Sequence, residues 1–131
     1  MRSGAHEAVD ARIRAAFLRL GPVRKWLEGG CWSAAEGILE WYGSGTLAVI
    51  RADRGFEEDV VDHVIARLGK DIFADARGVF TAKELISRWE HDEGIGAYLA
   101  EDASREEISR AGVQLKQSDK ARVVAALEKS K

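Results

Sequence analysis

The sequence is short of cysteine, proline and methionine, with one of each in 131 residues. A single cysteine, Cys31, excludes an intrachain disulfide, which fits a reducing compartment and leaves one thiol free for chemistry. No apolar run approaches the roughly 20 residues of a membrane-spanning helix. The N-terminal segment Met1–Glu7 also lacks the apolar core of a secretory signal. We therefore expect a cytoplasmic protein that does not enter the membrane.

An excess of charge of either sign is also missing. The chain carries 20 Lys and Arg against 22 Asp and Glu, for a net charge of -2. Without a strong positive field, binding to a nucleic-acid backbone or an anionic membrane is not favoured. The length and the hydrophobic content of 46% predict a single globular domain, residues 1–131, with an adequate core.

Hydrophobic periodicity predicts two helices in the first third of the chain. Apolar residues recur at three- and four-residue steps over Ala5–Leu20 and again over Cys31–Tyr42. The pair Gly29–Gly30 breaks the chain before the second helix, and Gly43–Gly45 ends it. Cys31 is therefore expected to open a helix.

Short β-branched runs bounded by turn residues predict a small antiparallel sheet. Thr46–Ile50 is expected to form a buried strand, and the runs Val60–Leu68 and Asp71–Arg77 are expected to form a β-hairpin. The first hairpin strand contains His63 and the second contains Asp75.

The last third of the chain is expected to be helical. Thr81–Glu84 and Ser104–Glu107 have the pattern of capping boxes, and Ser118 or Asp119 is expected to cap a final helix. Helices, then a small sheet, then helices predict an α+β fold. We expect a core over about residues 22–92, in which the helix opened by Cys31 packs against the sheet, and a helical C-terminal extension over about 93–131.

Cys31 is the candidate nucleophile. Backbone donors and the dipole at a helix N-terminus stabilise a thiolate, and the side-chain-free Gly30 lets a substrate backbone approach. The amide of Cys31 or Trp32 is a candidate donor to a developing oxyanion, and Trp32 is well placed to line a substrate groove. The alternative is that Cys31 is a buried small hydrophobe.

His63 and Asp75 are polar residues inside apolar strands. An imidazole there needs a hydrogen-bond partner or a cleft, and a carboxylate is costly to bury alone. The alternatives are a satisfied core histidine and an aspartate that merely ends a strand. A three-residue loop containing Gly69 would place Asp75 opposite or diagonal to His63, and we predict that class of loop.

The order of these residues resembles the papain-like superfamily of cysteine hydrolases and transferases. The likeness covers about residues 29–78, from Gly29-Gly30-Cys31-Trp32 to the strands around His63 and Asp75. It is similar to the transglutaminase-like, bacteriocin-processing peptidase and NlpC-type branches. Several of these families carry a Gln shortly before the nucleophile as an oxyanion donor, whereas this chain has Arg24-Lys25-Trp26 there.

The resemblance implies a catalytic triad. Cys31 would be the nucleophile, His63 the general base and later acid, and Asp75 the residue that fixes the imidazole tautomer. The implied activity is acyl hydrolysis or transfer on a protein, peptide or small amide, as in a peptidase, amidase, deamidase or transglutaminase-like enzyme.

No cofactor or metal is expected. His91-Asp92-Glu93 are consecutive residues of a predicted helix, so their side chains diverge around its axis. The alternative function is a non-catalytic interaction domain, such as an inhibitor, an immunity factor or a degenerate papain-like relative.

Overall fold

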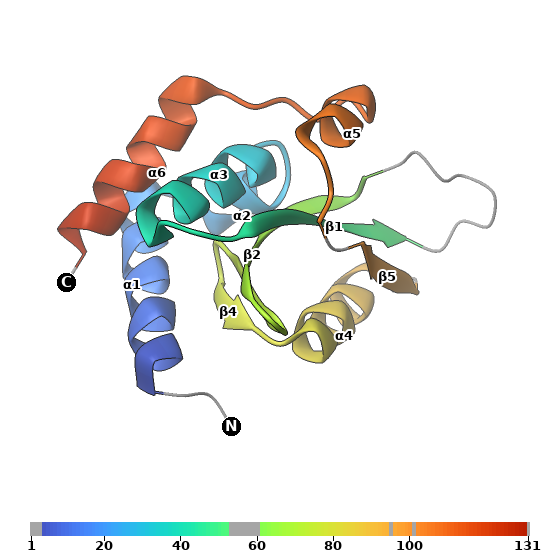
Figure 1. Ribbon diagram of the computed structural model, residues 1–131, viewed down its shortest axis with the longest axis horizontal. Helices are drawn as coiled ribbons and strands as arrows, with labels where there is room; N and C mark the ends of the chain where they lie inside the picture. Colours follow the sequence, from blue (N-terminus) through green and yellow to red (C-terminus); the bar gives the residue numbers. More distant parts are fainter. Residues whose placement is uncertain (1–3, 53–60, 95, 101, 131) are drawn as a thin grey trace.

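The protein is a sheet with helices on both faces (Figure 1). The computed structural model describes residues 4–52, 61–94, 96–100 and 102–130. The helices are α1 (Gly4–Leu20), α2 (Val23–Leu27), α3 (Cys31–Tyr42), α4 (Ala82–Glu93), α5 (Arg105–Arg110) and α6 (Gln117–Lys129). The strands are β1 (Thr46–Ala52), β2 (His63–Gly69), β3 (Ile72–Asp75), β4 (Gly78–Phe80) and β5 (Ala97–Ala100). Mixed helix and antiparallel sheet agree with the predicted α+β class.

The five strands form one antiparallel sheet in the order β4-β3-β2-β1-β5. Strands β1 to β4 follow one another in the chain and lie side by side in the sheet. The chain then passes through α4, and β5 pairs with the free side of β1. The strand bearing His63 is therefore the central one, and the strand ending at Asp75 is its neighbour.

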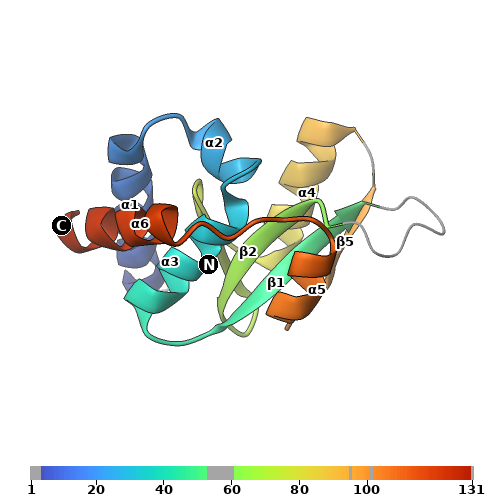
Figure 2. The ribbon, with the colours of Figure 1, turned by 90° about the horizontal axis from the view of Figure 1, so that it is seen from above.

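Two apolar clusters hold the layers together. The larger one lies between the sheet and helices α1, α2, α3 and α6, and it includes Leu47 and Val49 of β1. The smaller one lies between the other face and α4, and it includes Ala48 and Ile50 of the same strand. Because alternate residues of a strand point to opposite faces, the middle of β1, Leu47–Ile50, is apolar on both faces. Figure 2 gives a second view of the sheet and its helices.

Both predicted capping boxes are confirmed at the starts of α4 and α5. Thr81 accepts from the amide of Glu84, Ser104 accepts from the amide of Glu107, and each glutamate bonds back to its cap residue. The final helix departs from the prediction. It begins at Gln117 after Lys116, without a side-chain cap, so Ser118 and Asp119 lie within its first turn.

The C-terminal region is not a purely helical extension. Strand β5 lies within residues 93–131 and pairs with β1 from Val49↔Ala100 to Ala52↔Ala97. Helix α6 packs against α1 and α3 and places Val123 and Leu127 in the larger apolar cluster. Residues beyond the expected boundary near residue 92 therefore complete both the sheet and the apolar core.

None of the helices among the described residues combines the length and the apolar character needed to cross a bilayer.

Candidate active site

Cys31 is the first residue of α3, as the glycine pair before it predicts. The turn that leads into the helix is fixed by a bond from the Gly30 amide to Lys25 O at 2.8 Å. A side chain at Gly30 would collide with this turn, because an added Cβ would lie 3.0 Å from Lys25 O and 3.1 Å from Trp26 Cε3. The Cys31 side chain is only 4% exposed, and its sulfur accepts from the backbone amides of Val64 and Trp32.

The side chains of His63 and Asp75 are in contact at one end of the sheet, where both are buried. His63 opens β2 and Asp75 closes β3. His63 Nε2 donates to Asp75 Oδ2 at 3.1 Å, with residue exposures of 3% and 2%. A carboxylate on the neighbouring strand thus fixes the orientation of the ring, as the sequence analysis expected.

The hairpin reaches this geometry by a different turn from the one predicted. Its loop is the two-residue pair Lys70–Asp71, with Asp71 at a φ of 55°. The register then shifts between Arg67 and Gly69, and beyond the shift Ala66 pairs with Ala74. Continuing that register sets Asp75 opposite Ile65, diagonal to His63. The irregularity supplies the offset that we had assigned to a three-residue loop. The predicted strand start at Val60 lies outside the described residues.

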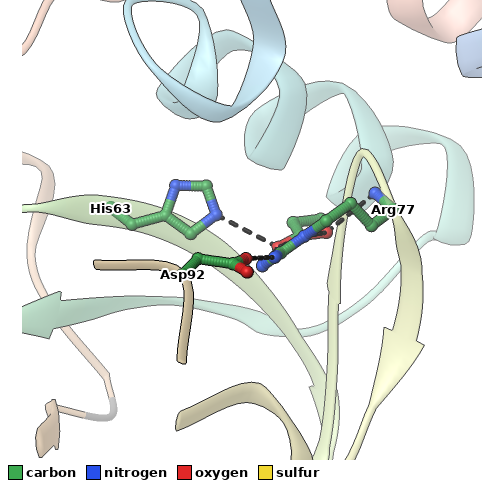
Figure 3. A network of polar contacts seen from close by, with 4 residues as sticks. His63, Arg77 and Asp92 are labelled. Carbon is green, nitrogen blue, oxygen red and sulfur yellow. Dashed lines mark hydrogen bonds and ion pairs between the residues drawn. The ribbon is translucent and has the colours of Figure 1, made fainter. Parts of the chain in front are cut away.

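Arg77 is a member of the site that the sequence analysis missed (Figure 3). Its Nη2 donates to Asp75 Oδ2 at 2.8 Å, and its backbone amide donates to Oδ1 at 2.8 Å. Asp92 of α4 accepts from Arg77 Nη1 at 3.5 Å. The spacing of Asp75 and Arg77 around a predicted turn was the available signal, because an arginine two residues after an aspartate can turn back on its carboxylate.

The remaining ring nitrogen of His63 is left for the thiol. In Figure 3 one nitrogen bonds to Asp75 and the other points away from it. That second atom, Nδ1, is buried and has no partner of full hydrogen-bond geometry among the described residues. The Cys31 thiol and the His63 ring nevertheless interact closely enough for each to shift the pKa of the other.

The electrostatics favour charged forms of all three groups. Burial raises the pKa of the Cys31 thiol, but hydrogen bonding and charge attraction from His63 outweigh it, so the net pKa is lowered. Burial lowers the pKa of His63, yet hydrogen bonds to Asp75 and Cys31 raise it to about 9. Burial likewise opposes ionisation of Asp75, while His63 and then Arg77 hold its pKa well below the usual range. The Cys31–His63 pair is therefore shifted toward a thiolate beside an imidazolium.

Two pockets meet at this pair. One, of about 520 Å³, is lined by Gly30 and Cys31 and reaches toward the segment before α6. The other, of about 450 Å³, is lined by His63 and reaches toward α4. Both have Glu28 and Asp62 in their walls, so these two side chains mark where the pockets adjoin.

Trp32 lines neither of these two pockets, contrary to its predicted substrate-binding role. Its side chain is 6% exposed, and Nε1 donates to Glu36 Oε2 at 3.2 Å. Arg105 of α5 donates to both Glu36 oxygens, at 2.5 and 2.7 Å. Because Trp32 is one residue further along the helix than Cys31, it points about 100° away, into this inter-helix contact.

The amides named as oxyanion donors are engaged. The Cys31 amide donates to Glu28 O at 3.3 Å, and the Trp32 amide donates to the Cys31 sulfur. In the segment Arg24-Lys25-Trp26 before the nucleophile, Lys25 is the residue that lines the pocket beside Cys31. Its ammonium lies over the Trp26 ring and 3.5 Å from Asp119.

Among the described residues, no three side chains of His, Cys, Asp or Glu gather as a metal site would require. His91, Asp92 and Glu93 lie on the exposed last turn of α4.

Comparison with known proteins adds no relative: no family model, no curated protein and no solved structure matches the chain.

Proposed function

We propose that this protein is a cysteine-dependent acyl hydrolase or acyl transferase of the papain-like type. The observation that carries the proposal is the buried hydrogen bond between His63 Nε2 and Asp75, beside the buried Cys31 thiol at the start of α3, whose pKa His63 lowers. A buried carboxylate that steers an imidazole toward a thiol at a helix start is the arrangement that thiol catalysis needs.

The reaction follows from the charges of the pair. The Cys31 thiolate attacks the carbonyl carbon of an amide or ester, and the carbonyl π electrons move to oxygen. As the tetrahedral intermediate collapses, the C–N or C–O bond breaks and His63 gives its proton to the leaving group. His63 then removes a proton from water or an amine, which attacks the thioester and releases Cys31 as a thiolate. Asp75 stays ionised throughout and stabilises the imidazolium.

The reactivity of Cys31 tests this proposal directly. We expect iodoacetamide to alkylate it at pH 6 at least 10-fold faster than an ordinary thiol, since each unit of lowered pKa gives about a tenfold larger thiolate fraction there. In His63→Ala the rate at pH 6 should fall about 10-fold or more, because only the backbone amides of Val64 and Trp32 then oppose the rise in the thiol pKa that burial causes.

His91→Ala is the matched control, because it removes an imidazole from an exposed position on α4. It should leave the rate unchanged. An inert thiol in the folded wild type, with normal alkylation after denaturation, would reject the enzyme and favour the non-catalytic interaction domain.

A further inference from the structure

We infer that Gln114, in the segment between α5 and α6, is a further catalytic residue, whose side-chain amide donates a hydrogen bond to the oxyanion that forms when Cys31 attacks an acyl group. Gln114 and Cys31 line the same pocket of about 520 Å³. This inference rests on the proposed function and deepens it, because it assigns a donor to a step for which the site described above has none free.

The developing oxyanion needs a donor that is not already engaged. Attack by the Cys31 thiolate moves the carbonyl π electrons onto oxygen, and a hydrogen-bond donor aimed at that oxygen lowers the barrier. The Cys31 amide donates to Glu28 O at 3.3 Å, and the Trp32 amide donates to the Cys31 sulfur. His63 bonds to Asp75 through one ring nitrogen and gives the proton of the other to the leaving group. The donor must therefore come from another part of the pocket wall.

Three side chains in the wall of the larger pocket carry N–H donors: Lys25, Gln114 and Lys116. The Lys25 ammonium lies over the Trp26 ring and 3.5 Å from Asp119, so it is already held. Lys116 is exposed and carries a full charge, and moving an ammonium from water into contact with a substrate costs far more than moving an amide. The neutral amide of Gln114 is therefore the side-chain donor best suited to this pocket.

The backbone around Gln114 is anchored, while its side chain is free to meet a substrate. Val113 and Leu115 are half-buried against the larger apolar cluster. The Lys116 amide donates to Ser33 Oγ at 3.0 Å, and Ser33 is a buried residue of α3. Gln114 itself is exposed and makes no hydrogen bond with another described residue. Its segment is thus tied to the helix that carries the nucleophile, and both N–H groups of its amide are available.

Two reactions of the same thiol separate an oxyanion donor from a residue that only supports the fold. Acetylation by p-nitrophenyl acetate passes through a tetrahedral oxyanion before the C–O bond breaks and p-nitrophenolate leaves. Alkylation by iodoacetamide displaces iodide from a saturated carbon and forms no oxyanion. In Gln114→Ala, acetylation of Cys31 should slow about 100-fold, as on removal of one oxyanion donor, while alkylation at the same pH should be unchanged.

Further variants locate the effect in one amide. Gln114→Glu keeps the size of the side chain but replaces its N–H donors with a carboxylate oxygen, so it should lower the ratio of acetylation to alkylation at least as far. Gln117→Ala is the matched control, because Gln117 is an exposed residue at the start of α6 and lies outside the pocket. Both of its rates should equal those of the wild type. Lys116→Met tests the competing donor, and it too should acetylate at the wild-type rate.

The inference and the proposed function fail in different ways. If Cys31 acetylates in the folded protein and Gln114→Ala acetylates at the wild-type rate, Gln114 is not the donor while the thiol enzyme stands. Equal slowing of acetylation and alkylation, or a selective loss of acetylation in Lys116→Met instead, would also refute the inference. If Cys31 does not acetylate in the folded wild type, the proposed function falls and the oxyanion donor falls with it.

Discussion

The Asp75 carboxylate accepts more hydrogen bonds than any other side chain described in the site. It accepts from His63, from the Arg77 side chain and from the Arg77 backbone amide. A buried carboxylate with this many donors stays ionised, and its charge in turn raises the pKa of His63. Arg77 is therefore a positioning residue that acts on Cys31 through two others.

Replacing Asp75 with asparagine should separate these effects. In Asp75→Asn the pKa of His63 should fall from about 9, because burial then dominates, and the acidic limb of Cys31 alkylation should move to higher pH. Unfolding in urea should show a loss of about 3–5 kcal/mol, the cost of breaking one side of a buried ion pair.

Asp92→Asn is the control for that experiment, since Asp92 is the exposed partner of Arg77 at 3.5 Å. It should cost less than about 1 kcal/mol. Equal losses in the two variants would contradict the central position of Asp75. If Asp75→Asn does not fold, Arg77→Lys keeps the charge but loses the two-pronged contact, and it should shift the same alkylation profile by a smaller amount.

At the scale of helices and strands, the turn between α2 and α3 sets the position of the Cys31 thiol. Gly30 has φ -97° and ψ 8°, which alanine can adopt, so a substitution there is opposed only by contact with Lys25 and Trp26. At the neighbouring Gly29 an added Cβ meets nothing within 4 Å.

This difference gives a matched pair of variants. Gly30→Ala should displace the start of α3, slow alkylation of Cys31 at pH 6 several-fold and lower stability by about 1–3 kcal/mol, the usual cost of overpacking. Gly29→Ala should preserve the rate. The measurements are alkylation kinetics and urea unfolding, and similar rates in both variants would show that the turn does not set the thiol's position.

The sequence predicts the first and last residues of a helix well where glycines lie on both sides of it. Helix α3 begins and ends at the predicted residues, because a glycine pair precedes it and Gly43 closes it at φ 95°. Strand β5 was missed because Ala97–Ala100 is four residues long and takes its strand geometry from β1 rather than from local preference. The start of α6 was misplaced for a related reason: Lys116 is held by tertiary contact with Ser33 at 3.0 Å rather than by a local cap.

The candidate site was predictable only in part, because composition reveals residues but not the neighbours that they acquire. Polar residues inside apolar runs identified His63 and Asp75, and the glycine pair identified Cys31. The inward contact of Trp32 depends on Glu36 and Arg105, which lie on helices whose packing the local pattern does not encode. A tryptophan beside a nucleophile was therefore assigned to the wrong face.

Across the whole molecule, stability should depend on the same buried charges. The pKa of His63 is raised to about 9 in the folded protein, so its contribution is fully present below its ordinary value near 6.5 and is lost as the pH rises through 9. The pKa of Asp75 is lowered, so its contribution is present above its ordinary value near 3.8 and is lost as the pH falls below it. The free energy of unfolding should therefore be highest between about pH 4 and 6.5 as far as these two groups decide it.

Urea unfolding at a series of pH values checks this expectation. The wild type should lose stability from pH 7 to 9.5, and His63→Gln should flatten that alkaline slope. A slope that persists unchanged in the variant would show that other groups set the alkaline limit.

The two end helices of the described chain are tied together, and this has a consequence for how activity arises. Arg12 of α1 donates from Nε to Leu127 O of α6 at 3.0 Å, and α3 packs against α6 through Gly37, whose added Cβ would lie 2.6 Å from Val123 Cγ1. During synthesis, the ribosome must therefore release residues beyond 120 before the helix that carries Cys31 gains its full support. In a nascent chain that does not yet include α6, the sulfhydryl of Cys31 should react as slowly as an ordinary one. Its reactivity should rise only after α6 has been translated.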